Sequence, residues 1–588
     1  MGENKSRIFI DLSVDIVNSF FKNVQGVEEK MILTKIEEKL KSIFKDEYQE
    51  EFLDEFRLLF NKWKKEQWDS INAPTEKNVY LITYGDSIYE QGKPTLETLH
   101  QFLKKEVPNT ITDVHLLPMF PYTSDDGFSV VDYNEINPEL GNWDHIKNMS
   151  RDYRLMYDFV ANHISKSSKW FQGYLNGEEK YQNYFIPHNS EFDTTQVVRP
   201  RTSPLIHEYK GKDGVKTAWT TFGEDQVDLN FGHFPVLLET TEILLSYAHK
   251  GASSIRLDAI GFIWKQSGTS SIHLPEAHTI IQLWRDVLNY FKPNTQIITE
   301  TNVPHQENIS YFGDGSNEAH MVYQFSLPPL VLHTMTTHDA TKLSSWAKTI
   351  GKVSDEATYF NFLASHDGIG MRPTEGILTE EEKQRLVDKV VENGGRISYK
   401  TNTDGSQSVY EMNINYSNAL INKGEDDTKE LVVKKMLAAH SILLSVIGVP
   451  AIYYHSLLGS ENDYEGLETS GINRRINREK LEFGEITREL KENARRKEIF
   501  EGLLKMISTR QQQSAFSPYA SQTVVDVDSN VFALKRRNEM TADEVFFIVN
   551  VDSKPVVANI GIKGQDLLTG KEIDSEVTLE PYQFFWVR

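Results

Sequence analysis

The sequence predicts an α/β protein: a (β/α)8 TIM barrel with subdomains inserted at its mouth, a helical extension before it and a small antiparallel β domain after it. Two observations carry this prediction. From residue 79 onward, eight short apolar runs alternate with longer segments of helical periodicity. Beyond residue 512, strand-like runs follow one another without helices. Near-continuous apolar strands separated by helices indicate a buried parallel sheet, and eight such units complete a barrel.

The first element is a helical extension, residues 1–75, that is dense in Lys and Glu. Between residues 31 and 68 its apolar side chains recur at helical spacing and include Phe44, Phe56 and Trp63. We interpret this segment as two or more amphipathic helices that pack onto the main domain. A coiled-coil partner helix is the alternative, which we disfavour because Phe and Trp suit a docking face better than a zipper.

The barrel itself is predicted from the eight apolar runs. They lie at residues 79–84, 114–119, 155–160, 254–259, 296–301, 321–326, 359–365 and 451–454. Segments of helical pattern separate them, among them 95–107, 236–250 and 277–291. The predicted barrel runs in three parts, residues 76–163, 233–367 and 426–511.

Two long connections interrupt the barrel. The third and fourth strands are separated by far more chain than one helix requires, and residues 164–232 are rich in Tyr, Asn, Pro and Gly. We therefore predict an inserted subdomain there, at the mouth. A second excursion covers residues 368–425. The C-terminal β domain is residues 512–588, and its predicted strands are 523–527, 531–536, 545–550 and 583–587.

Composition limits the partners. The formal net charge is −22, which repels phosphate backbones and anionic lipid, so nucleic acid and membrane surface are poor partners. A small anion would need a local cluster of Arg or Lys. There is no cysteine, which excludes disulfides and thiolate chemistry and fits a reducing cytoplasm. No signal peptide is recognisable and the most apolar run, 441–454, is too short to span a bilayer. We expect a soluble, cytoplasmic protein.

Carboxylates at strand ends are the main chemical signal. Asp258 ends the fourth run, Glu300 the fifth, and Asp367 follows the seventh. Glycoside chemistry needs one carboxylic acid to protonate the leaving oxygen and one carboxylate to meet the oxocarbenium carbon. Asp258 and Glu300 are one βα unit apart and can flank one bond. Arg256 lies on the same strand face as Asp258 and is expected to keep it ionised.

Four motifs carry a resemblance to a known superfamily. They are DFVANH (158–163), SIRLDAIGF (254–262), TETN (299–302) and FLASHD (362–367). In order and spacing they resemble the four signature regions of the α-amylase superfamily (glycoside hydrolase family 13). The resemblance implies that Asp258 is the nucleophile, Glu300 the general acid/base and Asp367 the transition-state stabiliser. It also implies that His163, Arg256 and His366 line the subsite for the transferred glucose.

Further motifs resemble the sucrose phosphorylase branch of that superfamily. TSDDGFSVVDY (123–133) and GINRRINRE (471–479) carry this similarity. It implies that Asp125 and Arg478 close a pocket for one glucose. Five more segments resemble the glucosylglycerate phosphorylases of the branch: VVRPRTSPL (197–205), GTSSIHLPEAH (268–278), ITETNVPH (298–305), EAHMVYQFSLPPLVLH (318–333) and YEMNINY (410–416).

The activity that the resemblance implies is reversible, retaining phosphorolysis of 2-O-α-D-glucosyl-D-glycerate to α-D-glucose 1-phosphate and D-glycerate. Inorganic phosphate is then a co-substrate, and no metal or organic cofactor is expected. Arg199 and Arg201 flank the stiff Pro200 and could bind phosphate or carboxylate bidentately. With Glu411 and Asn413 they are our candidates for the acceptor and phosphate site. A homodimer is left open.

Several alternatives remain at this point. A phosphorylase for sucrose, sucrose 6′-phosphate or glucosylglycerol would differ only in its acceptor pocket. A retaining α-glucoside hydrolase on the same scaffold would use water in place of phosphate. A catalytically silent sugar-binding or regulatory protein is disfavoured by the intact set of Asp258, Glu300 and Asp367.

Overall fold

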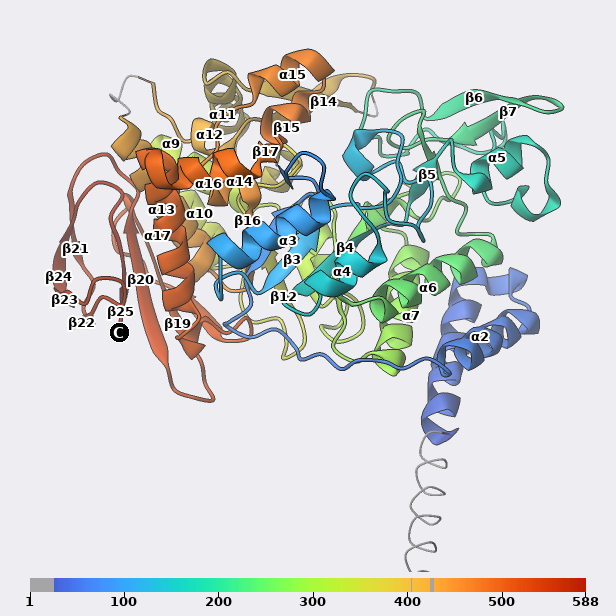
Figure 1. Cartoon of the computed structure of the whole chain (residues 1–588), viewed down its shortest axis with the longest axis horizontal. Coiled ribbons are helices and arrows are strands. Elements are labelled where there is room, and N and C mark those ends of the chain that lie inside the picture. The colour runs from blue at the N-terminus through green and yellow to red at the C-terminus, as the bar shows by residue number, and fades with distance from the viewer. Residues whose placement is uncertain (1–25, 403, 424–427) are drawn as a thin grey trace, which may run out of the picture.

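A closed barrel of eight parallel strands forms the centre of the molecule (Figure 1), which confirms the predicted fold class. The computed structural model describes residues 26–402, 404–423 and 428–588. In chain order the barrel strands are β1 (Tyr80–Thr83), β3 (Asp113–Leu116), β4 (Arg154–Val160), β9 (Ala252–Asp258), β10 (Gln296–Thr299), β11 (Met321–Tyr323), β12 (Thr358–Asn361) and β16 (Val449–Tyr453).

Strand register brings polar side chains together inside the barrel. Arg256 of β9 lies beside Asp158 of β4, and Asp258 lies beside Val160. On its other side β9 pairs with β10, where Leu257 lies beside Thr299. The carboxyl ends of β9 and β10 are therefore neighbours. All seven residues of β9 are buried, so Arg256 and Asp258 are held by a rigid strand.

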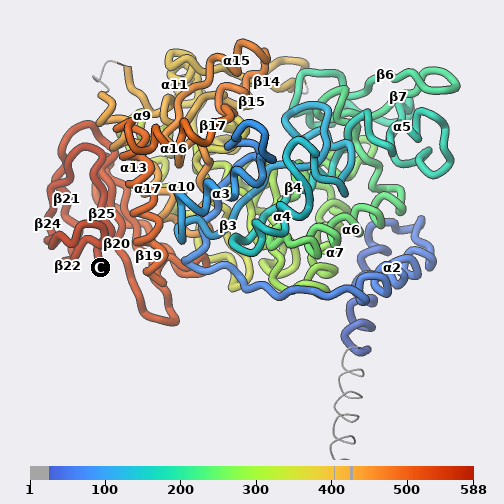
Figure 2. The backbone as a smooth tube through the Cα atoms, viewed as in Figure 1, coloured from blue at the N-terminus to red at the C-terminus, as the bar shows by residue number. Residues whose placement is uncertain are grey.

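Helices cover the outside of the barrel (Figure 2). Both α6 (Phe234–His249) and α7 (Pro275–Phe291) carry proline in the first turn, where its missing N–H breaks no helical hydrogen bond. The other helices around the barrel are α3 (Thr95–Glu106), α4 (Trp143–Met149), α8 (His305–Ile309), α9 (Leu327–Thr337), α10 (Thr341–Ala347), α13 (Lys429–Ser445), α14 (Tyr454–Leu457), α15 (Tyr464–Ser470), α16 (Phe483–Glu492) and α17 (Ala494–Arg510). None of the helices in the described ranges has both the length and the apolarity that crossing a bilayer requires.

The N-terminal extension packs on the outer surface of the barrel. Residues 26–44 are helical, and α2 (Glu50–Trp63) follows. Phe52 of α2 stacks on Phe234 of α6 with ring centroids 4.0 Å apart. Lys39 forms an ion pair with Asp286 of α7 at 2.6 Å. The aromatic residues thus form a docking face, as the sequence pattern predicted. Residues 1–25 of the predicted extension lie outside the described residues.

Two excursions from the barrel meet above its mouth. The first, between β4 and β9, contains β5 (His163–Ser165), α5 (Lys169–Leu175), β6 (Ile206–Gly211), β7 (Gly214–Trp219) and β8 (Gln226–Asp228). The second, after β12, contains β13 (Ile369–Gly370), α11 (Glu380–Glu392), β14 (Arg396–Thr401), β15 (Gln407–Asn413) and α12 (Tyr416–Ala419). A β-bridge between Arg199 and Thr401 joins them. The residue limits of the domains stay a prediction.

The C-terminal segment forms an antiparallel sheet at the side of the barrel (Figure 1). Its order is β18 (Ser521–Val524), β19 (Val531–Arg537), β20 (Glu544–Asn550) and β25 (Phe584–Val587). Each of these strands overlaps a predicted one. Further short pairs join β21 (Val556–Asn559) to β24 (Glu576–Leu579), β22 (Gly564–Gln565) to β23 (Glu572–Ile573), and β2 (Ile88–Tyr89) to β17 (Leu481–Glu482); the sequence pattern did not predict these.

Candidate active site

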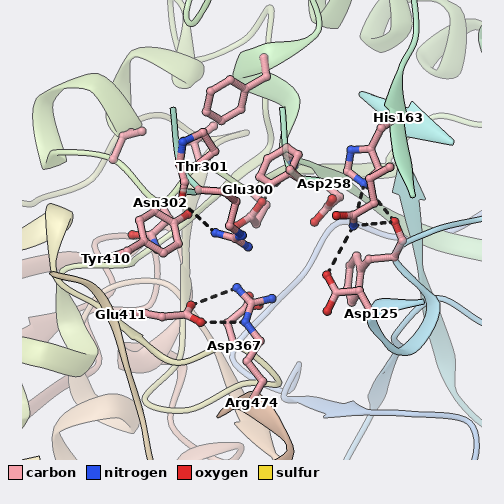
Figure 3. Close-up of a pocket in the computed structure, with 18 of the residues that line it drawn as sticks. Asp125, His163, Asp258, Glu300, Thr301, Asn302, Asp367, Tyr410, Glu411 and Arg474 are labelled. Atoms are coloured by element: carbon pink, nitrogen blue, oxygen red, sulfur yellow. Dashed lines mark hydrogen bonds and ion pairs between the residues drawn. The ribbon is translucent and has the colours of Figure 1, made fainter. Parts of the chain in front are cut away.

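A cavity of about 60 Å³ opens at the carboxyl ends of the barrel strands (Figure 3). Barrel strands and both excursions contribute to its wall. Its lining residues are Asp125, Phe128, His163, Pro200, Arg201, Phe222, Gln226, Asp258, Ala259, Phe262, Glu300, Thr301, Asn302, Val303, His366, Asp367, Arg372, Tyr410, Glu411 and Arg474. Five carboxyl groups and three guanidiniums therefore face one small space.

Asp258, Glu300 and Asp367 meet in this cavity. Asp258 is the last residue of β9, and Glu300 directly follows β10. Between them Ala259 has a φ of 50°, a left-handed conformation that is strained for alanine. Its backbone N–H donates to Glu300 Oε2 at 3.0 Å. The bend after β9 thus orients the second carboxyl toward the first. The catalytic roles of the three residues stay a prediction.

Arg256 lies beneath the carboxyl groups and does not line the cavity. Only 1% of its surface is exposed. Its Nη1 donates to Asp258 Oδ1 at 3.0 Å and also to Asp158, while its Nη2 lies 3.9 Å from Glu300 Oε1. One guanidinium therefore serves three carboxylates, with Asp158 as a partner that the sequence pattern did not indicate.

Both carboxyl groups of the pair are harder to ionise than free carboxyl groups. Burial raises the pKa of Asp258 well above its usual value, and Arg256 offsets this only in part. Burial also raises the pKa of Glu300. The two carboxyls repel when both are ionised, so they share protons as a pair. Arg256 is closer to Asp258 than to Glu300, which favours the ionised form on Asp258 and the proton on Glu300.

Asp367 has the opposite behaviour. Burial opposes its ionisation, but Arg474 and the other nearby guanidiniums outweigh burial and hold the pKa of Asp367 below its usual value. Arg474 Nη1 lies 2.8 Å from Asp367 Oδ1. Asp367 is therefore a fixed negative charge opposite the Asp258 and Glu300 pair.

One end of the cavity suits an uncharged sugar ring. Burial lowers the pKa of His163 to about 4 and that of His366 well below its usual value, so both imidazoles are neutral at pH 7. His366 stacks on Phe128 with ring centroids 4.8 Å apart. Gln226 Nε2 lies 3.4 Å from Asp125 Oδ2. Neutral donors and one carboxylate suit the hydroxyl groups of a sugar, and an aromatic wall suits the apolar C–H face of its ring. Gln226 was not among the predicted site residues, because its strand β8 pairs with β5 only in the fold.

Arg478 and Arg474 differ from the sequence expectation. Arg478 lies behind the cavity wall. Its guanidinium forms ion pairs with Asp126 at 2.6 Å and Asp125 at 3.6 Å and donates to the His366 carbonyl at 2.8 Å. It holds the loop that carries Asp125. Arg474, in the same RRINR segment, lines the cavity instead. The motif signalled an arginine at this site, but the turn that selects which one was not visible in the sequence.

The four acceptor candidates do not all reach the cavity. Arg201 lines it, and its guanidinium carbon lies 5.0 Å from the Tyr410 ring centroid and 5.4 Å from that of Phe222. Glu411 also lines it, but forms a bidentate pair with Arg474 at 2.8 and 3.0 Å. Arg199 faces a neighbouring cavity. Asn413 is not among the lining residues and donates to Ser398 Oγ at 2.9 Å.

Arg372 joins Arg201 in the cavity wall, although no motif in the sequence pointed to it. Its Nε is buried without a hydrogen-bond partner, and Glu375 lies 3.8 Å away. Within the described residues no carboxylate lies at ion-pair distance from Arg201. Arg201 is therefore a cationic group of the cavity wall that no described carboxylate pairs with. The described residues hold no group of three or more metal-ligating side chains.

Comparison with known proteins defines the class and then the family. The α-amylase catalytic domain model matches residues 105–390. With the eight-stranded barrel, the excursion after its third strand and the three carboxyls, this places the chain in the α-amylase superfamily. A glucosylglycerate phosphorylase of Spirochaeta thermophila is 46% identical over 83% of this chain and 82% of that protein. One of Escherichia coli is 42% identical over 91% and 95%. The chain belongs to the glucosylglycerate phosphorylase family.

A solved structure agrees with this assignment. The crystal structure of the sucrose 6F-phosphate phosphorylase of Thermoanaerobacter thermosaccharolyticum superposes with a TM-score of 0.71 at 25% identity. The match covers 86% of this chain and 98% of that one. The likeness covers most of both chains, so this chain shares its overall fold with that phosphorylase.

Proposed function

We propose that the protein reversibly phosphorolyses 2-O-α-D-glucosyl-D-glycerate, with retention, to α-D-glucose 1-phosphate and D-glycerate. Its family supports a glycoside phosphorylase, which is a hexosyltransferase. The observation that carries the choice of acceptor is Arg201, a guanidinium held between two aromatic rings beside the carboxyl pair, with no carboxylate partner in the described part of the chain. A carboxylate or phosphate that enters this site can form an ion pair with the Arg201 guanidinium.

In the first step Asp258 attacks the anomeric carbon while Glu300 gives its proton to the glycosidic oxygen. The bond from carbon to glycerate breaks, D-glycerate leaves, and a β-glucosyl ester forms on Asp258. Asp367 is the fixed negative charge that favours the oxocarbenium-like transition state. Neutral His163 and His366, with Asp125 and Gln226, hold the sugar hydroxyls.

In the second step phosphate enters the position that glycerate vacated. One of its oxygens attacks the anomeric carbon, the ester bond to Asp258 breaks, and α-D-glucose 1-phosphate forms. Two inversions give net retention. The attacking phosphate oxygen gives its proton to Glu300, which restores the acid that protonated the glycerate oxygen. Arg201 and Arg372 bind the phosphate and so favour it over water as the attacking group.

Glycerate and phosphate are both small anions that occupy this position in turn. The site therefore needs one set of cationic groups, and Arg201 and Arg372 supply it. A neutral acceptor such as glycerol or fructose would leave the Arg201 guanidinium without an anionic partner, at a cost of about 1.5–3 kcal/mol for each charged hydrogen bond. This cost favours glycerate over the acceptors of sucrose and glucosylglycerol phosphorylases. A cytoplasmic location, a homodimeric assembly and the absence of a cofactor stay predictions.

An acceptor panel in the synthetic direction tests the proposal. α-D-Glucose 1-phosphate is offered with D-glycerate, glycerol, fructose, fructose 6-phosphate or no acceptor, and phosphate release is measured. We expect the highest kcat/KM with D-glycerate and little release without acceptor. Faster transfer to glycerol, fructose or fructose 6-phosphate would favour the corresponding alternative phosphorylase. Phosphate and free glucose released at equal rates without acceptor would identify a hydrolase.

A further inference from the structure

A second, larger cavity of about 360 Å³ adjoins the one that holds the carboxyl pair. It lies where the two excursions meet, beside the β-bridge between Arg199 and Thr401. Its lining residues are Thr194, Thr195, Val197, Val198, Arg199, Arg372, Lys400, Thr401, Asn402 and Gly405. Three of them are cationic and none is acidic, although the whole chain carries a formal charge of −22.

The three cations have few counter-charges. Arg199 donates to the Ser203 carbonyl, and Lys400 Nζ donates to the neutral Asn402 Oδ1 at 2.7 Å. Two acidic residues lie near Arg372: Glu375 Oε1 is 3.8 Å from Arg372 Nε and its side chain is 45% exposed, and Glu307 interacts electrostatically with the same guanidinium. Burial lowers the pKa of Lys400, and the neighbouring Arg372 lowers it further. An anion between the cations would relieve this repulsion.

The two cavities share a wall. Arg372 lines both of them. The segment around Pro200 also contributes to both cavities. Arg199, before the proline, lines the outer cavity, and Arg201, after it, lines the inner one. Because proline fixes its backbone φ, the two guanidiniums are held on opposite sides of one rigid turn. A row of cationic groups therefore runs from the outer cavity to the carboxyl pair.

We propose that the outer cavity is a second anion site, which binds small oxyanions as they enter and leave the catalytic cavity. The class of ligand is phosphate or a small carboxylate. This inference rests on the proposed function, since it gives phosphate and glycerate a path through a protein whose net charge repels them. A local positive cluster raises the nearby concentration of anions and their rate of entry.

Lys400→Gln and Arg199→Gln test the site, because neither side chain lines the inner cavity. Each should raise the KM for phosphate, and that for glycerate in synthesis, by about three- to tenfold with kcat unchanged, and should weaken the dependence of kcat/KM on ionic strength. The matched control is Lys352→Gln, which removes the same charge from an exposed residue paired with Asp355 and should leave both KM values unchanged.

The outcomes separate this inference from the proposed function. If the wild type and Lys352→Gln make no α-D-glucose 1-phosphate, the proposed function fails. If they do, and both test variants keep the KM for phosphate and for glycerate within twofold, the outer site is wrong. A fall in kcat with KM unchanged would also overturn it, since that result indicates a structural role. A rise in only one KM would support the site and identify its ligand as phosphate or as the carboxylate.

Discussion

The floor and the rim of the catalytic cavity are built in different ways. The floor consists of Arg256 and Asp258 on β9, whose neighbours are fixed by the register of β4 and β10. The rim consists of Arg201, Arg372 and Arg474, which come from loops and short turns far apart in the chain. Strand pairing places the floor residues rigidly, whereas the rim depends on how two excursions meet.

The electrostatics of the two regions also differ. On the floor one guanidinium serves three carboxylates, so negative charge is in excess where a cationic transition state would develop. At the rim, Arg201 is held by aromatic rings, so its charge is available to an anion. The floor thus suits the transfer of glucose, and the rim suits the choice of its partner. Substitutions in the two regions should consequently separate chemistry from anion binding.

The largest effect should come from the floor. Asp258→Asn should lower kcat by about 10⁴-fold or more, because an amide cannot form the glucosyl ester. The circular dichroism spectrum should stay that of the wild type, since the side chain faces the cavity. Phosphorolysis measured as glucose 1-phosphate release checks this, and turnover within tenfold of wild type would remove Asp258 from its role.

Glu300→Gln should slow glucosyl transfer from glucosylglycerate more than transfer from glucose 1-phosphate. A glutamine cannot protonate the glycerate oxygen, so glucosyl transfer from glucosylglycerate should fall by about 10²–10⁴-fold. Phosphate is a better leaving group, and glucosyl-enzyme formation from glucose 1-phosphate should fall much less. Rapid-quench measurement of the glucosyl-enzyme from each donor gives the ratio. Equal losses with both donors would argue against Glu300 as the acid.

The same division explains what the sequence could predict. The period of the apolar runs predicted the eight strands, and Asp258 and Glu300 could be placed on neighbouring strands because parallel strands end at one face. Rim positions depend on long-range packing. Arg478 and Arg474 are four residues apart, and whether each meets Asp126 or Asp367 is decided by a tight turn, η7 (Asn473–Asn477). The sequence contained no signal for that choice.

The sequence also could not predict that the buried Arg256 guanidinium is shared between carboxylates. The alternation of Arg256 and Asp258 along one strand predicted their contact, which the structure contains at 3.0 Å. It could not predict that Asp158, on a strand about 100 residues earlier in the chain, shares the same guanidinium. The effect of Arg256 on Asp258 is therefore weaker than the local pattern implied.

At the rim, Arg201→Ala should raise the KM for phosphate and for glycerate together, by about ten- to a hundredfold, because one charged hydrogen bond is lost. Glucose recognition should persist, which competitive inhibition by glucose can measure. Arg201→Lys is the matched variant: it keeps the charge but loses the planar stacking between Phe222 and Tyr410, so its effect should be intermediate. If neither KM moved by more than twofold, the acceptor assignment would fail.

The smallest effect should be on stability, with opposite signs for Asp258 of the floor and for Asp367, which pairs with Arg474 of the rim. The folded-state pKa of Asp258 is raised, so its favourable contribution is present at low pH and is lost as pH rises through that pKa. Asp258→Asn should thus raise the melting temperature at pH 8, by about 1 °C or more, with a smaller gain at pH 5.

The folded-state pKa of Asp367 is lowered, so its contribution is present at neutral pH and lost as pH falls through that pKa. Asp367→Asn should then lower the melting temperature at pH 8, with a smaller loss in acid. Differential scanning calorimetry of both variants across this range checks the signs, and equal shifts at every pH would contradict the protonation described for these two carboxyl groups.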